Sequence, residues 1–463
     1  MSSAGDPAAI LEKNLDDSLA ASAEAVEVVF VDGRYSHLEY LTVQPEEKPA
    51  VPAVQQDLRI DRPQMKSFGS CRTLRNGTVV RGKSPGGFVV QLGTAEKPAD
   101  LLRLPTLTIT GRVEGRWKVA FADEHLYKLE ENVEIGEIGG SSTLSLHAVS
   151  RQADLRQGRL LVLILDSPKG RLEVENIRFS PAAQKTVRQP DRGIWMWDQR
   201  PAVQNPRRVA DDLQKRAMGR LYLQVGDDVE SLAPFLREAR RRGIAVWALD
   251  GSPAYALDAE PLFARLGRVR DFNRKFPEAA FAGFQVDIEP HLNPDFRVRL
   301  EDYGKALASV LSRLKREGDL PVSAVIPFWY DMLRIEDRSL AWHVLRVVDE
   351  GAIMSYRTSF AEIENISAEE LAYGATMGIP VHLGLETSPI PDERHVVFRR
   401  CPAPPAAATT RENRWCRVRE YTVPGGRVSF NGRPEELAGV LAGRPDRPAF
   451  GGWIVHSYES APR

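Results

Sequence analysis

Two spacings of apolar residues follow one another along this chain, and the change between them falls near residue 185. From about residue 26 to 180, short runs rich in Val, Ile, Leu and Thr are separated by clusters of Gly, Pro, Asp and Lys. Short strands at regular spacing, with turn residues between them, are typical of an all-β sandwich. We therefore expect a β-sandwich of the jelly-roll kind over residues 26–180, preceded by an N-terminal tail of residues 1–25.

A polar, proline-bearing linker over residues 181–192 leads to a second pattern, in which apolar strands alternate with amphipathic helices. Eight stretches have the length of buried strands: 193–198, 220–226, 243–251, 281–289, 321–329, 351–357, 380–387 and 451–460. Eight strand–helix units over residues 193–463 predict a (β/α)8 barrel. An open doubly wound sheet is the alternative, but no strand is followed by G-x-G-x-x-G or a phosphate-binding P-loop.

The chemistry of such a barrel sits at the carboxyl ends of its strands, where the loops converge. Six of the eight predicted strands end in an acid or beside one. The fourth, GFQVDIEPH, carries Gln285, Asp287 and Glu289 at alternate positions, so the three side chains share one face. Converging carboxylates repel one another and resist desolvation, and a fold keeps them mainly where they are used. We expect the fourth strand to bring a catalytic pair to the barrel mouth.

The fourth strand resembles that of family 18 glycoside hydrolases, the chitinase group. The family carries D-x-x-D-x-D-x-E there, and this sequence has Ala282, Gln285, Asp287 and Glu289 at those four places. The resemblance implies that Glu289 protonates the leaving oxygen and that Asp287 orients an N-acetyl group of the substrate as nucleophile. The chain of acids is shorter here, because Ala282 and Gln285 stand where the family has aspartates.

Two further segments are similar to the chitinase group. Its sixth strand contains Met-x-Tyr-Asp, which corresponds here to Met354, Tyr356 and, in place of the acid, Arg357. By this resemblance Tyr356 steadies the N-acetyl group. The family also carries a tryptophan on the eighth strand, where this sequence has Trp453.

A second resemblance is to the retaining glycosidases whose acid/base is a glutamate after strand four and whose nucleophile is a glutamate at the end of strand seven. Glu289 followed by Pro290 resembles the Asn-Glu-Pro of that clan, and Glu386 lies where the nucleophile belongs. Ile288 replaces the asparagine that would bind the sugar 2-hydroxyl.

Both resemblances imply cleavage of a glycosidic bond through an oxocarbenium-like transition state, with retention expected over inversion. Glu289 is the proton donor in either case, Asp287 and Glu386 compete for the nucleophilic or orienting role, and Tyr356 assists. A donor must hold a proton near neutral pH, which an apolar wall and a neighbouring carboxylate favour. The expected substrate-binding residues are Asp198, Asp250, Gln285, Trp329, Arg357, Trp453 and Tyr458.

Composition and cysteines set the remaining expectations. The 62 basic and 63 acidic side chains balance, which does not favour a nucleic acid as partner, and no apolar run is long enough for a membrane span. Asp287 and His291 lack the spacing of a metal site, and no cofactor is expected. Cys401 and Cys416 bracket a Pro/Ala-rich stretch that a disulfide could close. We expect a periplasmic or extracellular protein, although the N-terminus shows no signal peptide.

Two other functions stay open at this point. A non-catalytic saccharide-binding protein on a hydrolase-like barrel is compatible with the incomplete acid chain of the fourth strand. A barrel enzyme with a substrate other than sugar is compatible with the fold, because a fold does not fix a function. The first domain resembles the carbohydrate-binding jelly-roll modules that precede many polysaccharide enzymes, and this resemblance favours a polysaccharide or oligosaccharide as partner.

Overall fold

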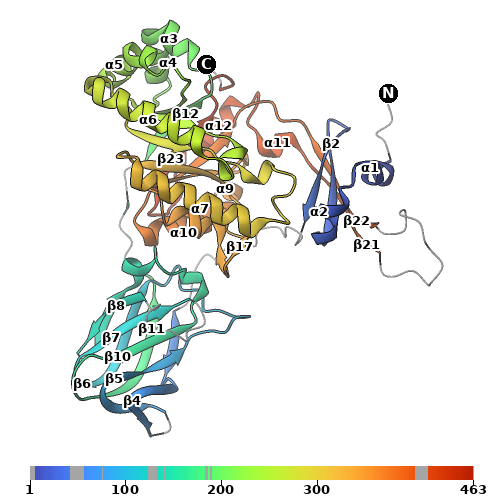
Figure 1. Ribbon diagram of the computed structural model, residues 1–463. Coiled ribbons are helices and arrows are strands. Elements are labelled where there is room, and N and C mark those ends of the chain that lie inside the picture. Colours follow the sequence, from blue (N-terminus) through green and yellow to red (C-terminus); the bar gives the residue numbers. More distant parts are fainter. Residues whose placement is uncertain are drawn as a thin grey trace, which may run out of the picture.

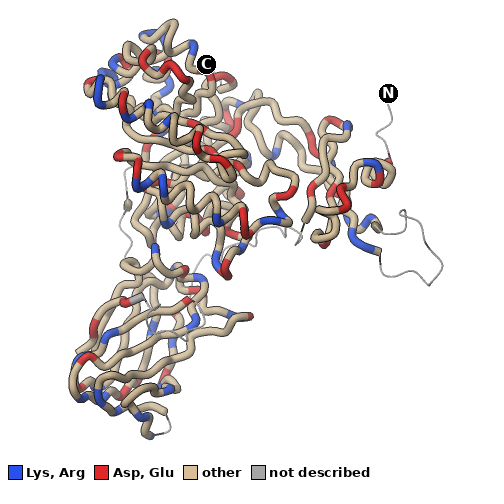
Figure 2. The backbone as a smooth tube through the Cα atoms, viewed as in Figure 1, with Lys and Arg blue, Asp and Glu red and all other residues tan. Residues whose placement is uncertain are grey.

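The computed structural model has three parts: a closed barrel, a nine-stranded antiparallel sheet and a four-stranded sheet (Figure 1). It describes residues 6–41, 57–75, 77–123, 133–139, 141–182, 186–187, 190–401 and 415–461. In Figure 1 the nine-stranded sheet lies below the barrel and the four-stranded sheet stands beside it. Acidic and basic residues are interspersed over all three parts (Figure 2). Of the helices in the described ranges, none has the length and apolar character needed to cross a bilayer.

The barrel consists of eight parallel strands that pair in sequence order, and the last strand pairs with the first. They are β12 (Asp191–Met196), β13 (Arg220–Gln224), β14 (Ala245–Asp250), β15 (Gly283–Val286), β16 (Val322–Pro327), β19 (Glu350–Met354), β20 (Val381–Glu386) and β23 (Phe450–His456). Each overlaps one of the eight predicted stretches, so the predicted (β/α)8 barrel is confirmed.

The helices of the barrel lie in the connections between these strands. They are α3 (Arg200–Gln204), α4 (Pro206–Lys215), α5 (Ala233–Arg241), α6 (Glu260–Lys275), α7 (Leu300–Glu317), α8 (Leu340–Leu345), α9 (Phe360–Ile366), α10 (Ala368–Met377), α11 (Gly425–Val428) and α12 (Pro434–Ala442). A small hairpin, β17 (Arg334–Ile335) and β18 (Arg338–Ser339), precedes α8. Apolar faces of these helices bury Leu, Phe and Val against the strands.

A buried ionic cluster closes the bottom of the barrel. Arg220, which begins β13, contacts Glu350, which begins β19, and its guanidinium lies 3.4 Å from the ring of His382 on β20. All three side chains are buried. Tyr222 accepts a further hydrogen bond from Arg220 at 3.0 Å. The Arg220 guanidinium is therefore paired on several sides, which is how a buried charge is tolerated.

Two indole rings fill the level above this cluster. Trp195 and Trp247 flank the ring of Tyr222, each at 6.1 Å between ring centres. Two glycines make room for them: a Cβ on Gly283 would lie 2.3 Å from the Trp247 ring, and one on Gly384 would lie 2.9 Å from the Trp195 ring. The interior below the mouth is thus packed, as in other barrels of this kind.

The N-terminal strands differ from the prediction that residues 26–180 form one domain. β1 (Ala25–Val31) and β2 (Arg34–Leu41) pair with each other, and β1 pairs with β21 (Glu393–Arg400), which continues to β22 (Trp415–Val423). The last two strands are an insertion between β20 and β23 of the barrel. The four-stranded order β2-β1-β21-β22 therefore joins the N-terminal strands to an insertion of the barrel.

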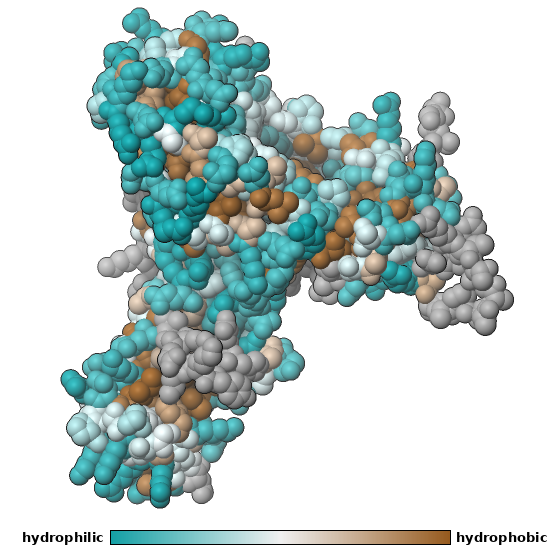
Figure 3. Space-filling model, in the orientation of Figure 1, coloured by the Kyte–Doolittle hydropathy of each residue, from teal (hydrophilic) through white to brown (hydrophobic). Residues whose placement is uncertain are grey.

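The alternation of side chains in β1 explains this pairing. Val26, Val28 and Phe30 point to one face, where they pack against Val396 and Phe398 of β21. Helices α1 (Pro7–Asn14) and α2 (Asp17–Ser22), which fall within the predicted tail, cover that face. Figure 3 shows apolar side chains among hydrophilic ones in the region where this sheet adjoins the barrel.

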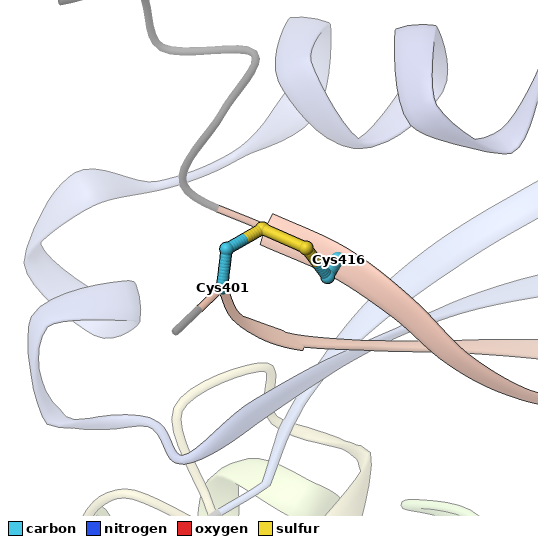
Figure 4. The surroundings of a disulfide bond; sticks show 2 residues. All are labelled: Cys401 and Cys416. Carbon is cyan, nitrogen blue, oxygen red and sulfur yellow. A yellow bond between two sulfur atoms is a disulfide. The ribbon is translucent and has the colours of Figure 1, made fainter. Parts of the chain in front are cut away.

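The disulfide between Cys401 and Cys416, which the sequence left open, is present and closes the ends of β21 and β22 (Figure 4). The Pro/Ala-rich segment between the two cysteines, residues 402–414, lies outside the described residues. The third cysteine, Cys71, is a buried thiol.

A separate antiparallel sheet region accounts for most of the first half of the chain. Its strands are β3 (Leu58–Asp61), β4 (Met65–Leu74), β5 (Val79–Gln91), β6 (Thr106–Glu114), β7 (Trp117–Ala122), β8 (Val133–Ile138), β9 (Ser142–Ser145), β10 (Leu160–Leu165) and β11 (Gly170–Ser180). Trp117, the one tryptophan between residues 26 and 180, is fully buried. The sandwich arrangement and the binding of carbohydrate stay predictions.

The nine-stranded sheet is attached to the outside of the barrel by charged contacts. Arg103 pairs with Glu369 of α10 at 2.7 Å, and Asp123 pairs with Arg338 of the β17–β18 hairpin at 2.7 Å. The indole N–H of Trp342 on α8 donates to a backbone carbonyl of the sheet domain at 2.9 Å. These contacts lie on helices α8 and α10 and on the β17–β18 hairpin, so the sheet packs against the outside of the barrel.

Asp154, at the centre of this interface, should make the stability of the protein depend on pH. Its carboxylate is fully buried and accepts hydrogen bonds from the Tyr373 hydroxyl at 3.0 Å and from the Ser339 amide at 3.3 Å. Burial is the largest influence and raises its pKa to about 6 from an ordinary 3.8. A raised pKa means that the folded state binds the proton more tightly, so this contribution to stability is lost as pH rises from about 4 to 6. The loss amounts to about 3 kcal/mol.

Denaturant unfolding of wild type and Asp154→Asn at pH 4.5 and 7.5 measures this effect. We expect the free energy of unfolding of the wild type to fall relative to that of the variant as the pH rises. The asparagine does not titrate, so all other ionisable groups cancel in the comparison. An equal difference between the two proteins at both pH values would contradict the assignment.

Candidate active site

The end of β15 places two carboxylates at the barrel mouth. β15 stops at Val286, and the backbone amide of Asp287 still bonds the carbonyl of Asp250 on the neighbouring strand at 3.0 Å. Glu289 follows two residues later, directly before the short turn Pro290–Leu292. Burial, followed by the negative charge of Glu289, raises the pKa of Asp287 well above its ordinary value. The Asp287–Glu289 pair therefore retains a proton at a pH where an isolated aspartate has lost it.

His291 contacts Glu289 from the side, and Tyr330 contacts His291 in turn. Nε2 of His291 lies 3.3 Å from Oε2 of Glu289, and Nδ1 lies 3.2 Å from the hydroxyl of Tyr330. Tyr330 follows β16 and is fully buried, whereas the Glu289 side chain remains 27% exposed. The proposed proton donor is thus accessible to a substrate and oriented by a partner from its own loop.

Glu386 ends β20 and faces the mouth as an oriented anion. Oε1 accepts hydrogen bonds from the amides of Thr387 at 2.8 Å and Ser388 at 2.6 Å, and Oε2 lies 2.7 Å from Nδ1 of His456. Burial, the largest influence, would raise the pKa of Glu386, but His456 and the Ser388 amide outweigh it and the net shift is downward. Glu386 is therefore ionised where Asp287 is not.

The tautomer of His456 follows from its second partner. The indole N–H of Trp197 lies 2.8 Å from Nε2 of His456. An indole N–H can only donate, so Nε2 is the acceptor and carries no proton. The proton of a neutral His456 is then on Nδ1, the atom that faces Glu386.

Tyr356 lies beside the partner of Glu386 at the barrel mouth. It follows β19, and its ring centre lies 6.0 Å from that of His456, which contacts Glu386. Burial raises the pKa of Tyr356 well above the ordinary value, followed by the charges of Glu386, Asp287 and Glu289 in that order. Four catalytic candidates named from the sequence, Asp287, Glu289, Tyr356 and Glu386, thus end or follow strands of one barrel at its carboxyl end.

Arg297, in the connection between β15 and α7, lies beside the predicted substrate residue Trp329. Its guanidinium lies 4.4 Å from the ring centre of the half-buried Trp329. Burial, the largest influence, lowers the pKa of Arg297, while the charges of Glu39 on β2 and of Tyr330 oppose this. Trp329 also meets the ring of His291 edge-on at 5.2 Å. The predicted substrate residue Trp329 therefore packs against the loop that follows β15.

Two predicted substrate residues are placed where a substrate does not reach. Gln285 is fully buried below the mouth, where it accepts from the Trp195 indole at 2.6 Å and donates to Ser323 at 3.0 Å. Trp453 points outward from β23, donates to the carbonyl of Gly443 at 3.0 Å and packs against Phe360. Alternate residues of a barrel strand face opposite sides, and in β23 it is His456 and not Trp453 that faces inward.

Three other predicted residues have structural partners. Asp250 is buried and accepts from Gln224 at 3.2 Å and from the Gly251 amide at 2.9 Å. Asp198 accepts from both the amide and the guanidinium of Arg200 at 2.9 Å. The guanidinium of Arg216, directly after α4, lies 5.1 Å from the ring centre of Tyr458.

Arg357 lies beside the site without pairing to its carboxylates. Its guanidinium donates to the carbonyl of Tyr356 at 2.7 Å and lies 5.0 Å from the ring centre of Phe328. Burial, the largest influence, lowers the pKa of Arg357, and the positive charge of Arg427 adds to this. It stays a predicted substrate contact at the end of β19.

The site contains residues that the sequence did not identify as functional: Tyr330, His456, Trp197, Arg297 and Glu39. Tyr330 and His456 stand at predicted strand ends, so this position alone could have indicated them. Arg297 and Glu39 carry no such signal, because their role depends on a sheet whose strands lie far apart in the sequence.

Comparison with known proteins gives similarity of fold. No protein-family model matches the chain, and no curated protein matches it. Among solved structures, the CBM22-1-GH10 modules of a Clostridium thermocellum endo-1,4-beta-D-xylanase, complexed with xylohexaose, are 9% identical, cover 86% of this chain and 89% of their own, and have a TM-score of 0.33.

Two single-barrel structures are similar over a smaller share. A GH18 chitinase from Cycas revoluta in complex with (GlcNAc)3 is 12% identical, with 58% of this chain and 95% of its own covered and a TM-score of 0.31. A GH18 chitinase from Pseudoalteromonas aurantia is 10% identical, with 58% and 94% covered and a TM-score of 0.35. The similar structures are thus glycoside hydrolase barrels, at identities that carry no information on the reaction of this chain.

Proposed function

We propose that the protein is a glycoside hydrolase that cleaves a polysaccharide or oligosaccharide with retention of configuration. The observation that carries this proposal is that Asp287 and Glu289 follow β15 and Glu386 ends β20, so that all three stand at the carboxyl end of one closed barrel. Cleavage of a glycoside needs one proton donor and one anion or amide on the other side of the scissile bond.

The two strand ends supply these two requirements in opposite protonation states. The Asp287–Glu289 pair holds a proton at a pH where an isolated aspartate has lost it, because burial and the charge of Glu289 raise the pKa of Asp287. Glu386 stays ionised, because amides and His456 stabilise its negative charge. Carboxyl groups whose environments push their pKa values apart are the usual basis for assigning acid and base. We assign Glu289 as the donor, since its side chain is accessible at the mouth.

The second role has two candidates. Glu386 would attack the anomeric carbon directly, or Asp287 would orient an acetamido group of the substrate that attacks instead. Both routes retain configuration. Direct attack is supported by the ionised state and the fixed orientation of Glu386, and substrate assistance is supported by the position of Asp287 two residues before the donor.

A screen of purified protein against defined glycans tests the proposal. The panel should contain β-1,4- and β-1,3-linked glucans, xylan, mannan and chitin oligosaccharides, with new reducing ends and the anomeric form of the first product as readouts. We expect hydrolysis of at least one glycan and a product that retains the configuration of the cleaved bond. Binding of a glycan without any product would favour the non-catalytic saccharide-binding alternative.

The disulfide supports a location outside the cytoplasm. Disulfides form and persist mainly in oxidising compartments, and Cys401–Cys416 closes the hairpin that completes the four-stranded sheet. We therefore propose a periplasmic or extracellular site of action, where polysaccharide substrates occur.

A further inference from the structure

His291 occupies a position that the reaction as proposed so far does not use. It follows the donor Glu289 by two residues, and its side chain is only 15% exposed. The rings of Trp329, Tyr330 and Phe296 surround it edge-on, with centres 5.2, 5.9 and 6.4 Å away. These three rings fix the orientation of the His291 ring, so the same nitrogen, Nε2, always faces Glu289.

The buried hydroxyl of Tyr330 decides which ring nitrogen carries the proton. Tyr330 keeps its proton, because burial and, after it, the charge of Glu289 raise its pKa well above the ordinary value. A buried O–H without an acceptor is costly. Within the described residues the acceptor at hydrogen-bonding distance is Nδ1 of His291, at 3.2 Å. Nδ1 therefore accepts, and the ring proton is on Nε2, the atom 3.3 Å from Oε2 of Glu289.

We propose that His291, oriented by Tyr330, is a positioning residue: its Nε2–H holds the carboxylate of Glu289 and keeps the proton of the Asp287–Glu289 pair on Asp287 until a substrate binds. This inference rests on the proposed function, since it concerns the proton that cleavage consumes. Ala282 and Gln285 stand where the chitinase group has further aspartates. In this protein a hydrogen-bond donor from the loop, His291, would instead determine which carboxyl group of the pair carries the proton.

The charges around His291 agree with this role. Glu289 faces it from its own loop, Asp287 lies behind Glu289, and Tyr330 faces it from the end of β16. A cation, Arg297, lies beside this group with its guanidinium on the Trp329 ring, and its charge acts on Tyr330. These neighbours leave Nε2 of His291 against the Glu289 carboxylate and Nδ1 against the Tyr330 hydroxyl.

The consequence is a shift in the pH dependence of the pair when the N–H is removed. A hydrogen bond to a carboxylate favours its ionised form, so loss of the bond makes both protonation steps of the pair occur at higher pH. We expect a shift of about one pH unit, which corresponds to one charge-assisted hydrogen bond. The alkaline limb of the kcat/KM profile, where the pair loses the proton that cleavage consumes, should move upward by this amount.

Three variants and two readouts test the inference. In His291→Ala the donor is lost, in His291→Gln an amide N–H replaces it, and in Tyr330→Phe only the hydroxyl that orients the ring is removed. An infrared titration of the free protein follows the neutral carboxyl band that Asp287→Asn abolishes. The kcat/KM profile against pH follows the same pair during turnover. Circular dichroism and thermal melting show whether each variant is folded.

We expect an upward shift of the infrared midpoint of about one pH unit in His291→Ala, a smaller shift in Tyr330→Phe, and a midpoint near the wild-type value in His291→Gln. Equal midpoints in all folded variants would overturn the inference. If His291→Ala does not fold, the infrared midpoints of Tyr330→Phe and His291→Gln are compared instead, and a higher midpoint in Tyr330→Phe supports the inference. The infrared readout needs no substrate, so a wild type that hydrolyses no glycan refutes the proposed function without touching this result.

Discussion

Glu289→Gln should lower kcat/KM on a cleaved glycan by about 10²- to 10⁴-fold, because an amide cannot donate the proton that the leaving oxygen needs. The loss should be smaller on aryl glycosides with acidic leaving groups, since these depart without protonation. The fold should not change, because the Glu289 side chain is partly exposed and its neighbour His291 can bond an amide oxygen as well as a carboxylate. Initial rates on both kinds of substrate measure the effect.

Asp198→Asn is the matched control for this variant. Asp198 is also a carboxylate near the end of a barrel strand, but both of its oxygens bond Arg200. It should keep the wild-type rate on both substrates. Wild-type turnover by Glu289→Gln on a natural glycan would remove Glu289 from the mechanism.

Glu386→Ala should lower kcat by at least about 10³-fold if Glu386 is the nucleophile. Sodium azide should then restore turnover, because a small anion fits the space left by the carboxylate and attacks the anomeric carbon in its place. The product would be a glycosyl azide with inverted configuration, which mass spectrometry and proton NMR identify. The bonds to the Thr387 and Ser388 amides are lost in this variant, so melting curves must accompany the rates.

The same experiment separates Glu386 from Asp287. If a substrate acetamido group is the nucleophile, azide will not rescue Glu386→Ala, and only N-acetylated glycans will be cleaved. Asp287→Ala would then show the larger loss, because the group that orients the acetamide is gone. A rescue of Asp287→Ala by azide, with none for Glu386→Ala, would contradict the assignment of Glu386 as nucleophile.

The barrel could be predicted from the sequence because its signals are local. A buried parallel strand is a short apolar run, and the helix that follows shows its own period of three to four residues, so each unit is visible within about 30 residues. The same holds for the catalytic pair. Asp287 and Glu289 lie two apart at the end of one strand, and that spacing alone puts both at the mouth. A disulfide was possible from two cysteines that bracket one segment, but the sequence left it open.

Other features depended on where strands sit relative to one another. Trp453 and His456 are both on β23, but which of them faces inward follows from the register of that strand in the closed barrel. Gln285 shares a face with Asp287, yet it lies one level deeper, under the indole of Trp195. Nothing in the local sequence separates a residue at the mouth from one on the level below.

What the sequence by itself determined is the barrel, its eight strand ends and the acids that stand on them, because these follow from periodicity within single units. Only the tertiary structure decided that β1 joins β21, some 370 residues away, and that Tyr330 and His291 meet at Glu289. Strand pairing and side-chain contact between distant segments are set by the packing of the whole chain. The helix and strand preferences of a short segment do not specify such long-range contacts.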